Sequence, residues 1–584
     1  MTIENGQRRA ARGLLVALEF LLAAVAVFLV CIYLFSSPQL AARAMRQDTM
    51  RIPLRPMRGQ ILDARLRPLA VSVEVQSVFA DPKGIDDPGK AATGLARIFN
   101  LDAADLESRL TEDPESRFLW IARRITPDQA EAVKGLDLEG VALTSEGHRQ
   151  YPNGALAAHV LGCVGVEEQG LEGLELLFDN RLRGHEGTAY VLADRRRRPI
   201  WASPDNFVPA DDGQHLVLTI DATVQAITEE AIAEARQKFH AHSVSAVVMD
   251  PRSGAILAMA NAPTFDPNRY ADFPLDARRN KCITDTFPPG SNCKPCIAAA
   301  AIDDGVARLG DVLDCEMGYW AAAKLHDAGH SYGRMTLAEV LIKSSNIGMA
   351  KLGVRMGNAR LYEGLGRFGF GRRTGLWLPG EDPGLVHPLR RWSKLSTTRI
   401  AFGQEFTETP LQMVRAFAAI ANGGRLVKPK ILLGVLDSRG QVVADLSAPE
   451  TVGQACTPAT ARQLVDRALL GVVEVGTGKS ARIDGYAIFG KTGTAQKIDP
   501  QTHAVSHEHY MGSFLAGAPA DDPRVVVGVI VDEPSAAAGY YGGTVVAPAA
   551  KKILEQVLPY LGVPRSEAPR ASADARLARQ TPRR

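Results

Sequence analysis

An apolar run near the N-terminus places the strongest constraint on how this chain can fold. Residues 14–35 contain a single charged side chain, Glu19. A helix of this length extends about 33 Å, enough to cross the hydrocarbon core of a bilayer. Arginines cluster in residues 8–12, and clustered positive charge stays on the cytoplasmic side of a membrane. We therefore expect a cytoplasmic segment over 1–13, a single-pass anchor over 14–35 in the inner (cytoplasmic) membrane, and a periplasmic remainder.

Two questions about this N-terminal region stay open at the level of sequence. Ala42-Arg43-Ala44 has the form of a signal-peptidase site, so cleavage is the alternative to a retained anchor. The apolar part of a signal peptide usually has only about 7–15 residues, which favours the anchor. Glu19 would lie inside the membrane, where it either pairs with a neighbouring membrane protein or reaches the interface or is protonated.

Length and charge limit what the rest of the chain can be. At 584 residues it exceeds what one hydrophobic core usually supports, so we expect at least two domains. The net charge of +2 gives no reason to expect a nucleic-acid partner. Compartment is therefore indicated by the N-terminal run and not by overall charge.

Six of the seven cysteines follow the expected anchor, on the oxidising side of the membrane, where disulfides are permitted. Cys293 and Cys296 form a C-x-x-C pair, and Cys282 and Cys315 are near them in sequence. Their spacing fits no common zinc pattern, and buried cysteine packs well as a small apolar residue. We therefore predict no metal and no cofactor, and leave a disulfide open.

Residues 50–210 form the first expected domain, which is β-rich and brings no nucleophile together with a base. Strand-like runs at 69–80 and 140–144 are separated by turn signals. The run Arg195 to Arg198 is interpreted as a solvated hairpin and not as a binding patch. Residues 563–584 are rich in arginine and poor in large apolar residues, so a disordered tail is expected there.

Residues 211–562 form the second expected domain, in which helical and β-rich segments alternate. Thr409 and Pro410 are typical of a helix N-cap and first turn, and Asn422-Gly423 is typical of a helix end. The expected strands include 216–220, 245–249, 255–260, 487–490 and 525–531, and the expected helices include 222–238 and 547–561. The pattern predicts an α/β (α+β) domain.

Ser291-Asn292-Cys293-Lys294 is the first of three short strings with chemical meaning. The prolines at 288–289 hold the chain extended, and a helix is expected from Ser291 through Ala300. Residues three apart share a helix face, so Lys294 can act on the Ser291 hydroxyl. A serine needs a base to become a nucleophile, and a lysine is a base only when a dry site and a nearby positive charge lower its pKa. Alone, Ser291 is more typical of an ordinary N-cap.

Ser344-Ser345-Asn346 is the second string. A capping box at Thr336–Glu339 starts the helix before it, and a second apolar helix is expected from Ile347 to Val354. The string therefore lies at a break between helices, where side chains can point into a cleft. There Ser344 can relay a proton, and Asn346 can bond both Lys294 and a substrate amide.

Lys491-Thr492-Gly493-Thr494 is the third string and follows the apolar run 486–489, which predicts a strand at the border of the same cleft. Gly493 lets a substrate backbone approach, whereas Lys491, Thr492 and Thr494 offer a cation and hydroxyls to a terminal carboxylate. Lys491 would also supply the positive charge that lowers the pKa of Lys294. The backbone N–H groups of Ser291 and Thr494 would form an oxyanion hole. Each string is weak alone, and only the combination is specific.

Together the three strings match the S-x-x-K, S-x-N and K-T-G set of enzymes that acylate a serine with penicillin-like amides. The chain resembles class B penicillin-binding proteins, and among them the cell-division (septal) peptidoglycan D,D-transpeptidases. The resemblance extends over nearly everything from the anchor to Leu561. Further matching segments are Arg58–Asp63, Pro68–Val73, Ala80–Lys83, Asp250–Gly254, Pro263, Asp266–Asn268, Arg279-Asn280, Gly403-Gln404, Thr409–Gln412, Ala421–Gly424 and Tyr541–Gly543.

The resemblance implies a penicillin-recognising serine transpeptidase fold on an elongated, β-rich pedestal of the penicillin-binding protein dimerisation type. It implies that Ser291 is acylated by the D-Ala-D-Ala end of a peptidoglycan stem peptide, and that the amine of a second stem resolves the acyl-enzyme as a crosslink. β-Lactam antibiotics would mimic the first step. We find no glycan-polymerising motif between 50 and 210, so a separate multi-pass membrane glycan polymerase and other division proteins are the implied partners.

Two departures and two alternatives accompany this resemblance. Pro288 stands where the family usually has an acidic residue, and cysteines next to Ser291 are unusual, which affects the cleft mouth and antibiotic affinity. One alternative is a D,D-carboxypeptidase or β-lactamase-like hydrolase, which the anchor and pedestal disfavour. The other is a non-enzymatic penicillin-binding sensor or division scaffold. Residues 1–13 are too few for a signalling domain, which disfavours a sensor. All the catalytic side chains are present, which disfavours an inactive scaffold.

Overall fold

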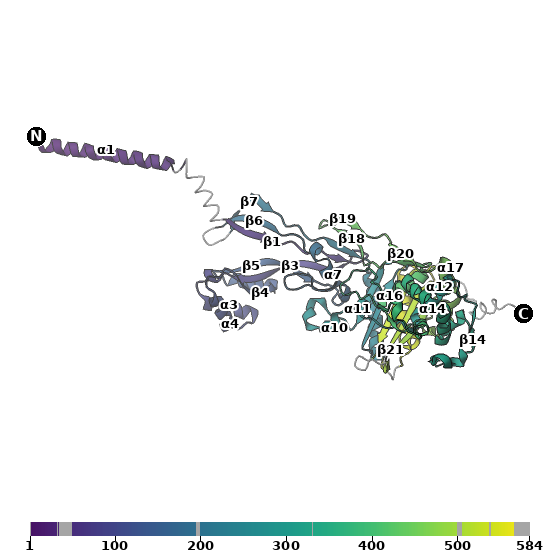
Figure 1. The fold of residues 1–584 in the computed structure, drawn as a ribbon. Helices are drawn as coiled ribbons and strands as arrows, with labels where there is room; N and C mark the ends of the chain where they lie inside the picture. The colour runs from purple at the N-terminus through teal and green to yellow at the C-terminus, as the bar shows by residue number, and fades with distance from the viewer. Residues whose placement is uncertain are drawn as a thin grey trace. The chain divides into compact units, whose positions relative to one another are not determined.

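The computed structural model describes residues 2–31, 33, 49–193, 199–329, 331–498, 505–535 and 539–565 (Figure 1). The chain divides into two compact units. The smaller unit comprises Met1–Pro56 and Gly184–Asp212, and the larger unit comprises Met57–Arg183 and Gly213–Arg584. The arginine run at 195–198, the candidate cleavage site at 42–44 and the expected tail from residue 566 onward lie outside the described residues.

The smaller unit contains one long helix and a small antiparallel sheet. Helix α1 (Thr2–Cys31) includes the segment Ala11–Cys31, the one helix in the described part of the chain that is long and apolar enough to cross a membrane. The predicted anchor at 14–35 overlaps this segment. The sheet has the strand order β1-β6-β7, with bounds β1 (Thr49–Leu54), β6 (Gly187–Ala193) and β7 (Pro199–Val208).

Within the larger unit, the segment before residue 183 forms a helix-covered sheet. Strand β3 (Pro68–Ala80) pairs with β4 (Leu119–Ile125) and with β5 (Val141–Gln150), which confirms strands at both predicted runs and extends the second. Three helices accompany it: α3 (Pro88–Phe99), α4 (Ala103–Glu112) and α5 (Pro127–Gly135). Each begins at a side-chain cap, and they share a buried core with these strands. Figure 1 shows α3 and α4 beside β3, β4 and β5.

A seven-stranded sheet continues from β3 into the second half of the chain. Its order is β19-β18-β8-β2-β3-β4, with β5 paired to β3. The short strand β2 pairs in parallel with β8, and β8 pairs in antiparallel fashion with β18. The bounds are β2 (Ile61–Leu62), β8 (His215–Leu218), β18 (Leu432–Leu436) and β19 (Val442–Asp445). One sheet therefore crosses the division that the sequence predicted at residue 211.

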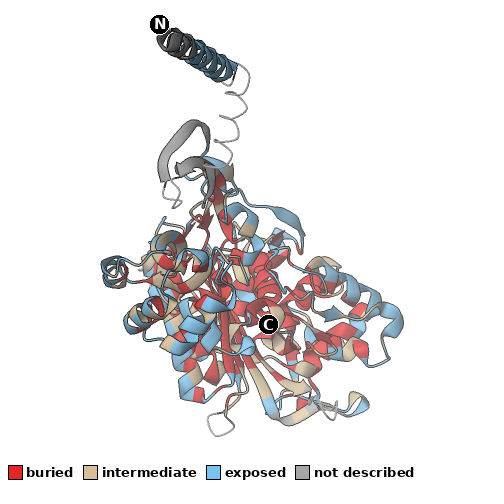
Figure 2. Ribbon diagram, turned by 90° about the vertical axis from the view of Figure 1, so that its left-hand side faces the viewer, coloured by how far each residue is buried: buried red, intermediate tan, exposed pale blue. Residues whose placement is uncertain are grey.

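A five-stranded antiparallel sheet forms the centre of the second half, in the order β10-β9-β23-β22-β21. Alternate residues of β23 face two different cores: Val527 and Val529 pack with α9 and α20, and Val526 and Ile530 pack with α12 and α16. Figure 2 shows buried residues concentrated in these strands and in the helices that cover them. The bounds are β9 (Ser243–Met249), β10 (Ile256–Ala262), β21 (Phe489–Ile498), β22 (Val505–Ala518), β23 (Val525–Asp532), α9 (Ala222–Phe239), α12 (Lys294–Asp303), α16 (Pro410–Ala421) and α20 (Ala547–Tyr560).

Several predicted elements are confirmed here. The hairpin around residues 250–254 is β9 and β10, and the helices at 222–238 and 547–561 are α9 and α20. Thr409 caps α16 as predicted, in a capping box with Gln412. Val563 is buried, and its carbonyl oxygen accepts a hydrogen bond from the Tyr486 hydroxyl at 2.9 Å, so the packed chain continues past the predicted start of the tail.

Short elements complete the described part of the larger unit. Its further helices are α6 (Ala158–Leu161), α7 (Gly173–Leu177), α8 (Asp179–Leu182), α10 (Leu275–Arg278), α11 (Lys281–Thr284), α13 (Leu337–Lys343), α14 (Asn346–Arg367), α15 (Ser396–Ile400), α17 (Pro458–Leu464), α18 (Leu470–Glu474) and α19 (Gly542–Val545). Its two-stranded pairs are β11 (Val312–Asp314) with β14 (Arg334–Thr336), β12 (Tyr319–Trp320) with β13 (Leu325–His326), β15 (Leu385–Val386) with β16 (Phe406–Thr407), and β17 (Arg425–Val427) with β20 (Thr451–Gln454).

Candidate active site

The first string forms a tight turn that leads into a helix. Residues Gly290–Cys293 are a 3-10 helix, η4, and the α-helix α12 begins only at Lys294. The prediction of an α-helix from Ser291 onward is therefore wrong in its first turn. Pro295 has no N–H to donate to the carbonyl oxygen of Ser291, which accepts from the N–H of Lys294 instead. Ser291 is partly exposed, and its hydroxyl makes no hydrogen bond with another described residue.

A glycine fixes the approach to this turn. Gly290 has a φ of +54°, a left-handed conformation that residues with a Cβ rarely adopt, and its N–H donates to the carbonyl oxygen of Gly403 at 3.0 Å. A Cβ added to Gly290 would lie 3.1 Å from the carbonyl oxygen of Thr494. The turn that carries Ser291 therefore packs directly against the strand that carries the third string.

Lys294 is fully buried and joins the first string to the second. Its Nζ donates to the carbonyl oxygen of Ser344 at 2.7 Å and to Asn346 Oδ1 at 2.8 Å, and Ser344 Oγ lies at 3.3 Å. Burial lowers the pKa of Lys294 from 10.5 to about 8. The predicted contact between Lys294 and Asn346 is confirmed, and a pKa of about 8 leaves part of the amine neutral near neutral pH.

The second string lies at a break between α13 and α14, as predicted. Thr336 and Glu339 form the capping box that starts α13. Ser344 follows with a φ of +63°, a conformation that costs a residue with a side chain about 1–3 kcal/mol and is typical of functional sites. Ser345 then caps α14 by accepting a hydrogen bond from the N–H of Gly348 at 3.0 Å. Helix α14 extends well beyond its predicted end at Val354, with a kink inside it.

Asp327 holds this break in place, and no sequence pattern indicated it. The residue follows β13 and is buried. Its carboxylate accepts hydrogen bonds from Ser345 Oγ at 2.7 Å and from the backbone N–H groups of Asn346 at 2.6 Å and Ile347 at 3.0 Å. A carboxylate on the first N–H groups of a helix also complements the helix dipole. The negative charge of Asp327 raises the pKa of Lys294 and so opposes part of the effect of burial.

Lys491 brings the third string to the same hydroxyl. It lies on β21, and its Nζ donates to Ser344 Oγ at 2.8 Å and to the carbonyl oxygen of Thr492 at 3.0 Å. Burial first, and the charge of Lys294 second, lower the pKa of Lys491 well below 10.5. The sequence predicts that Lys491 lowers the pKa of Lys294. In the structure burial is the main cause for both amines, and the effect of like charge falls on Lys491.

Gly493 occupies a position where a larger residue does not fit. A Cβ there would collide with Ser513 Oγ and would lie 2.5 Å from Asn292 Nδ2. Asn292 donates to Ser513 Oγ at 2.6 Å, so the turn that carries Ser291 and strand β22 are joined beside Gly493. Asn292 Oδ1 is buried and has no hydrogen-bond partner among the described residues. Sequence reasoning did not single out Asn292 or Ser513, because neither contact follows from a local pattern.

The two threonines of the third string are oriented by contacts within the protein. Thr492 Oγ1 and Thr477 Oγ1 are 2.6 Å apart, and Thr494 Oγ1 accepts a hydrogen bond from the N–H of Gly542 at 3.2 Å. Thr492 is buried and Thr494 is partly exposed. Their hydroxyl positions are therefore set before any ligand binds.

Three further buried groups lie in or near the turn that carries Ser291. Cys293 and Cys296 are free thiols, and burial raises the pKa of both, so both stay protonated at neutral pH. Glu408 is fully buried, and neither of its carboxylate oxygens has a hydrogen-bond partner among the described residues. Burial raises the pKa of Glu408 well above 4.5. In the described part of the chain, no group of three or more His, Cys, Asp or Glu side chains is arranged to hold a metal ion.

Comparison with known families decides which class of protein this site belongs to. The model of the penicillin binding protein transpeptidase domain matches residues 244–555, more than half of the chain. The chain belongs to the penicillin-binding protein transpeptidase family. The model of the penicillin-binding protein dimerisation domain also matches it, over residues 53–218. The predicted resemblance is therefore confirmed, together with the transpeptidase fold and its pedestal.

Named relatives of this penicillin-binding protein agree with that assignment. It is 35% identical over 554 residues to the peptidoglycan D,D-transpeptidase FtsI of Escherichia coli. That alignment covers 93% of the chain and 90% of FtsI. It is 34% identical to the stage V sporulation protein D of Bacillus subtilis, over 90% of the chain and 81% of that protein. Penicillin-binding protein 3 of Mycobacterium tuberculosis, solved with aztreonam, aligns with a TM-score of 0.69 and 30% identity over 88% of the chain and 98% of that structure.

The family segment that starts at Arg58 has a structural explanation in this penicillin-binding protein. Arg58 Nε donates to Glu175 Oε2 at 2.8 Å, and its Nη1 donates to Asp179 Oδ1 at 2.7 Å. Arg149 Nε donates to the other oxygen of Glu175 at 2.7 Å. Glu175 is completely buried, so its charge is stable only with these partners. The network joins the start of the larger unit to helices α7 and α8.

The family segment Tyr541–Gly543 is explained by close packing against the third string. A Cβ on Gly542 would collide with the carbonyl oxygens of Gly493 and Ser513. A Cβ on Gly543 would collide with the carbonyl oxygen of Thr477. Residues without side chains are therefore required at both positions for this segment to lie against β21 and β22.

Proposed function

We propose that the chain is a peptidoglycan D,D-transpeptidase that crosslinks stem peptides through an acyl-enzyme on Ser291. The observation that carries the proposal is the Ser344 hydroxyl, which accepts hydrogen bonds from two buried amines that come from separate strings. Lys294 is one helical turn from Ser291, and it also donates to Asn346. Family membership supports the same chemistry.

In the proposed acylation step, neutral Lys294 accepts the proton of the Ser291 hydroxyl. Ser291 Oγ then attacks the carbonyl carbon of the penultimate D-alanine of a D-Ala-D-Ala end. The backbone N–H groups of Ser291 and Thr494 hold the oxyanion. When the C–N bond breaks, the leaving amine receives a proton through Ser344, which both lysines contact. The products are an ester on Ser291 and free D-alanine.

In the second step the amine of another stem peptide attacks the ester carbon and transfers a proton to the pair of buried lysine amines, Lys294 and Lys491. Ser291 leaves with a proton and is restored as a hydroxyl, and the new amide is the crosslink. Lys491, Thr492 and Thr494 bind the terminal carboxylate of the donor peptide. Gly493 leaves room for its backbone, and Asn346 bonds its amide. A β-lactam enters the first step, but its leaving amine stays attached to the acyl group, so the ester persists.

We place this activity in septal cell-wall synthesis, at the outer face of the inner membrane. The similarity to FtsI supports the septal role, and the apolar segment Ala11–Cys31 supports a single-pass anchor with the catalytic part in the periplasm. A pedestal over 50–210 would carry a transpeptidase domain over 211–562. The glycan strands would come from a multi-pass membrane polymerase, with other division proteins as further partners.

Labelling with a fluorescent penicillin tests the assignment of the nucleophile. We expect one adduct on the wild type, none on Ser291→Ala, and a normal adduct on the control Ser447→Ala, which removes an exposed hydroxyl elsewhere. Labelling of the Ser291→Ala protein would refute the assignment. Incubation with a D-Ala-D-Ala peptide and an amine acceptor separates the alternatives. A transpeptidase forms the crosslinked amide, a hydrolase forms only the free acid, and a sensor or scaffold forms neither.

A further inference from the structure

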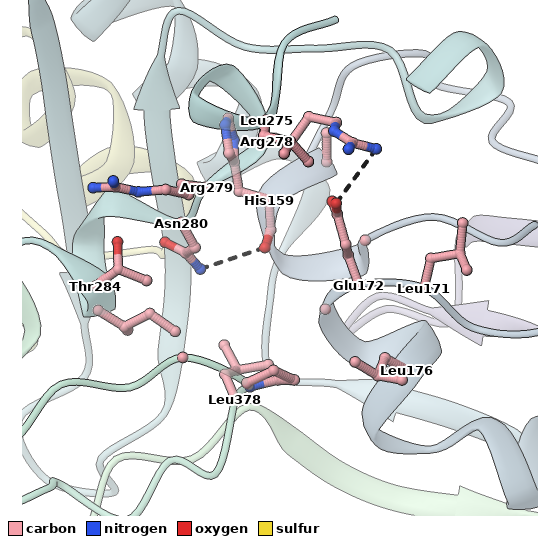
Figure 3. Close-up of a pocket in the computed structure, with 16 residues that line it drawn as sticks. His159, Leu171, Glu172, Leu176, Leu275, Arg278, Arg279, Asn280, Thr284 and Leu378 are labelled. Carbon is pink, nitrogen blue, oxygen red and sulfur yellow. Dashed lines mark hydrogen bonds and ion pairs between the residues drawn. The ribbon is translucent and has the colours of Figure 1, made fainter. Parts of the chain in front are cut away.

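A cavity of about 340 Å³ lies in the larger unit, and none of the proposed catalytic residues lines it. Its walls come from α6 and α7 with the chain between them, from α10 and α11, and from residues 378–380 (Figure 3). Cavities of about 300–1,000 Å³ are the usual size of small-molecule sites. The fold therefore contains a space of ligand size away from the proposed catalytic residues.

Four leucines contribute apolar surface to this cavity. Leu378 is buried, but Leu171, Leu176 and Leu275 are exposed, and 71% of Leu275 is accessible to solvent. A single exposed leucine needs no explanation, but three that line the same cavity form an uncovered apolar surface. The apolar body of a ligand would cover that surface.

Arg278 supplies a hydrogen-bond donor that the protein leaves unused. Its Nη1 lies 3.3 Å from Glu172 Oε1, but its Nε is buried and has no hydrogen-bond partner among the described residues. The Cys163 thiol also forms a hydrogen bond with the Arg278 side chain, but burial raises the pKa of this thiol to about 12, so it is a neutral partner and not an anionic one. An unpaired buried donor on a guanidinium costs free energy, and an acceptor on a ligand would recover it.

The other polar groups of the cavity already have partners. The ring of His159 bonds the carbonyl oxygen of Ala277 at 2.9 Å, and burial lowers the pKa of His159 to about 4, so the ring is neutral. Asn280 Nδ2 donates to the carbonyl oxygen of His159 at 3.4 Å. Arg279 points away from Arg278 in Figure 3 and pairs with Asp276 at 3.5 Å. Arg278 is therefore the group that a ligand would address.

We propose that this cavity binds a small amphipathic organic anion. Its carboxylate or sulfonate end accepts hydrogen bonds from Arg278, and its apolar body packs among Leu171, Leu176 and Leu275. A charged acceptor suits the guanidinium because charge-assisted hydrogen bonds are the strong ones. The site goes beyond the proposed acyl transfer, because none of the proposed catalytic residues lines it.

Isothermal titration of the full chain in lipid nanodiscs with 4-phenylbutyrate tests the proposal. We expect saturable binding to the wild type and at least tenfold weaker binding of the uncharged 4-phenylbutanamide. Leu176→Glu, which puts a negative charge on an exposed position of the lining, should weaken 4-phenylbutyrate binding at least tenfold, as should Arg278→Leu. The matched control is Leu395→Glu, at a similarly exposed leucine that does not line the cavity.

Binding should also be unchanged after Ser291 has been acylated with penicillin G, because the two sites are separate. Equal affinity for the anion and the amide, or equal affinity of the wild type and Leu176→Glu, would overturn the proposal. So would loss of binding on acylation, which would place the ligand in the catalytic cleft. Penicillin labelling of Ser291 is read independently, so failure of this proposal is distinguishable from failure of the proposed function.

Discussion

Lys491 and Ser344 are 147 residues apart in sequence, yet Lys491 Nζ lies 2.8 Å from Ser344 Oγ. The amine of Lys294 approaches the same oxygen at 3.3 Å. Two buried amines this close oppose each other's protonation, so the pair loses its first proton more readily than an isolated lysine. One neutral amine next to the Ser344 hydroxyl is the condition that the proposed proton transfer from Ser291 requires.

The first prediction concerns the pH dependence of acylation. Burial lowers the pKa of Lys294 to about 8, and the base must be neutral to accept a proton. The rate of acylation by a fluorescent penicillin should therefore rise about tenfold per pH unit below that pKa and level off at or before about pH 8. Lys294→Arg should abolish acylation at every pH, because a guanidinium stays protonated. The surface control Lys552→Gln should keep the wild-type midpoint, and a flat wild-type profile from pH 6 to 9 would contradict this role for the amine.

The second prediction concerns the space beside the third string. Gly493→Ala places a Cβ against Ser513 and Asn292, and both belong to well-packed buried surroundings. We expect acylation to slow at least about a hundredfold, because displacement of a catalytic strand by about 1 Å has effects of that size. Gly453→Ala is the matched control on another strand, since a Cβ there meets nothing within 4 Å. Equal acylation rates of the two variants, measured by stopped-flow labelling, would show that the close packing is irrelevant to catalysis.

The third prediction concerns the carboxylate under the second string. Asp327→Ala removes the acceptor for Ser345 Oγ and for two helical N–H groups. We expect a loss of about 2–3 kcal/mol in the free energy of unfolding and slower acylation, because Asn346 and Ser344 lose their support. Asp314→Asn alters a nearby carboxylate that caps only its own turn, and should change neither quantity. Denaturant unfolding and labelling kinetics measure the two effects, and normal kinetics in Asp327→Ala would refute the positioning role.

The fourth prediction concerns Glu408. Its pKa is raised in the folded protein, so the folded state holds a proton that the unfolded state releases above about pH 4.5. This carboxyl therefore favours folding at low pH, and the contribution is lost as the pH rises. Glu408→Gln should raise the melting temperature at pH 8 and leave it nearly unchanged at pH 4.5. Each unit of pKa shift corresponds to about 1.4 kcal/mol of unfolding free energy at pH 8. Calorimetry that shows the same shift at both pH values, or the same gain from the exposed control Glu363→Gln, would contradict it.

The fifth prediction concerns the buried ion network at Glu175. Glu175→Gln leaves the buried Arg149 without a counter-charge and leaves Arg58 with Asp179 alone, and should cost about 3–5 kcal/mol of unfolding free energy. Penicillin labelling of the remaining folded protein should be normal, because the network is outside the proposed catalytic cluster. Glu167→Gln, which alters an exposed carboxylate that pairs with Arg123, should cost less than about 1 kcal/mol. A similar loss in both variants would argue against the role of burial.

Local sequence patterns predicted much of the catalytic half, because its signals are short in range. The capping box at Thr336, the N-cap at Thr409 and the helix break at Ser344 are set by neighbouring residues, and all are found as predicted. The strings also identified Lys294, Asn346 and Lys491, which the structure joins by hydrogen bonds. The predicted role of Ser291 and of the threonines as ligands for substrate stays a prediction.

Features that depend on contacts between distant parts of the chain could not be predicted from local sequence patterns. Asp327 reaches the second string across 18 residues of chain, and nothing local marks it. Strand β22 (Val505–Ala518) was not predicted because its sequence mixes histidine, glutamate and glycine with apolar residues. For Lys294, sequence reasoning named a dry site and a nearby positive charge as the causes of a lowered pKa. Burial is the main cause in the structure, and its extent depends on the packing of the whole site.

The parallel pairing of Ile61 with Leu216 has a practical consequence for anyone who shortens this protein for crystallisation or inhibitor screening. A fragment that begins at residue 211 would lack β2, and the edge of β8 that pairs with β2 would have unpaired backbone N–H and C=O groups. Such an unpaired edge recruits other copies of the chain and promotes precipitation. A soluble fragment should therefore keep the polypeptide from Met57 onward, even when only the penicillin-reactive half is wanted.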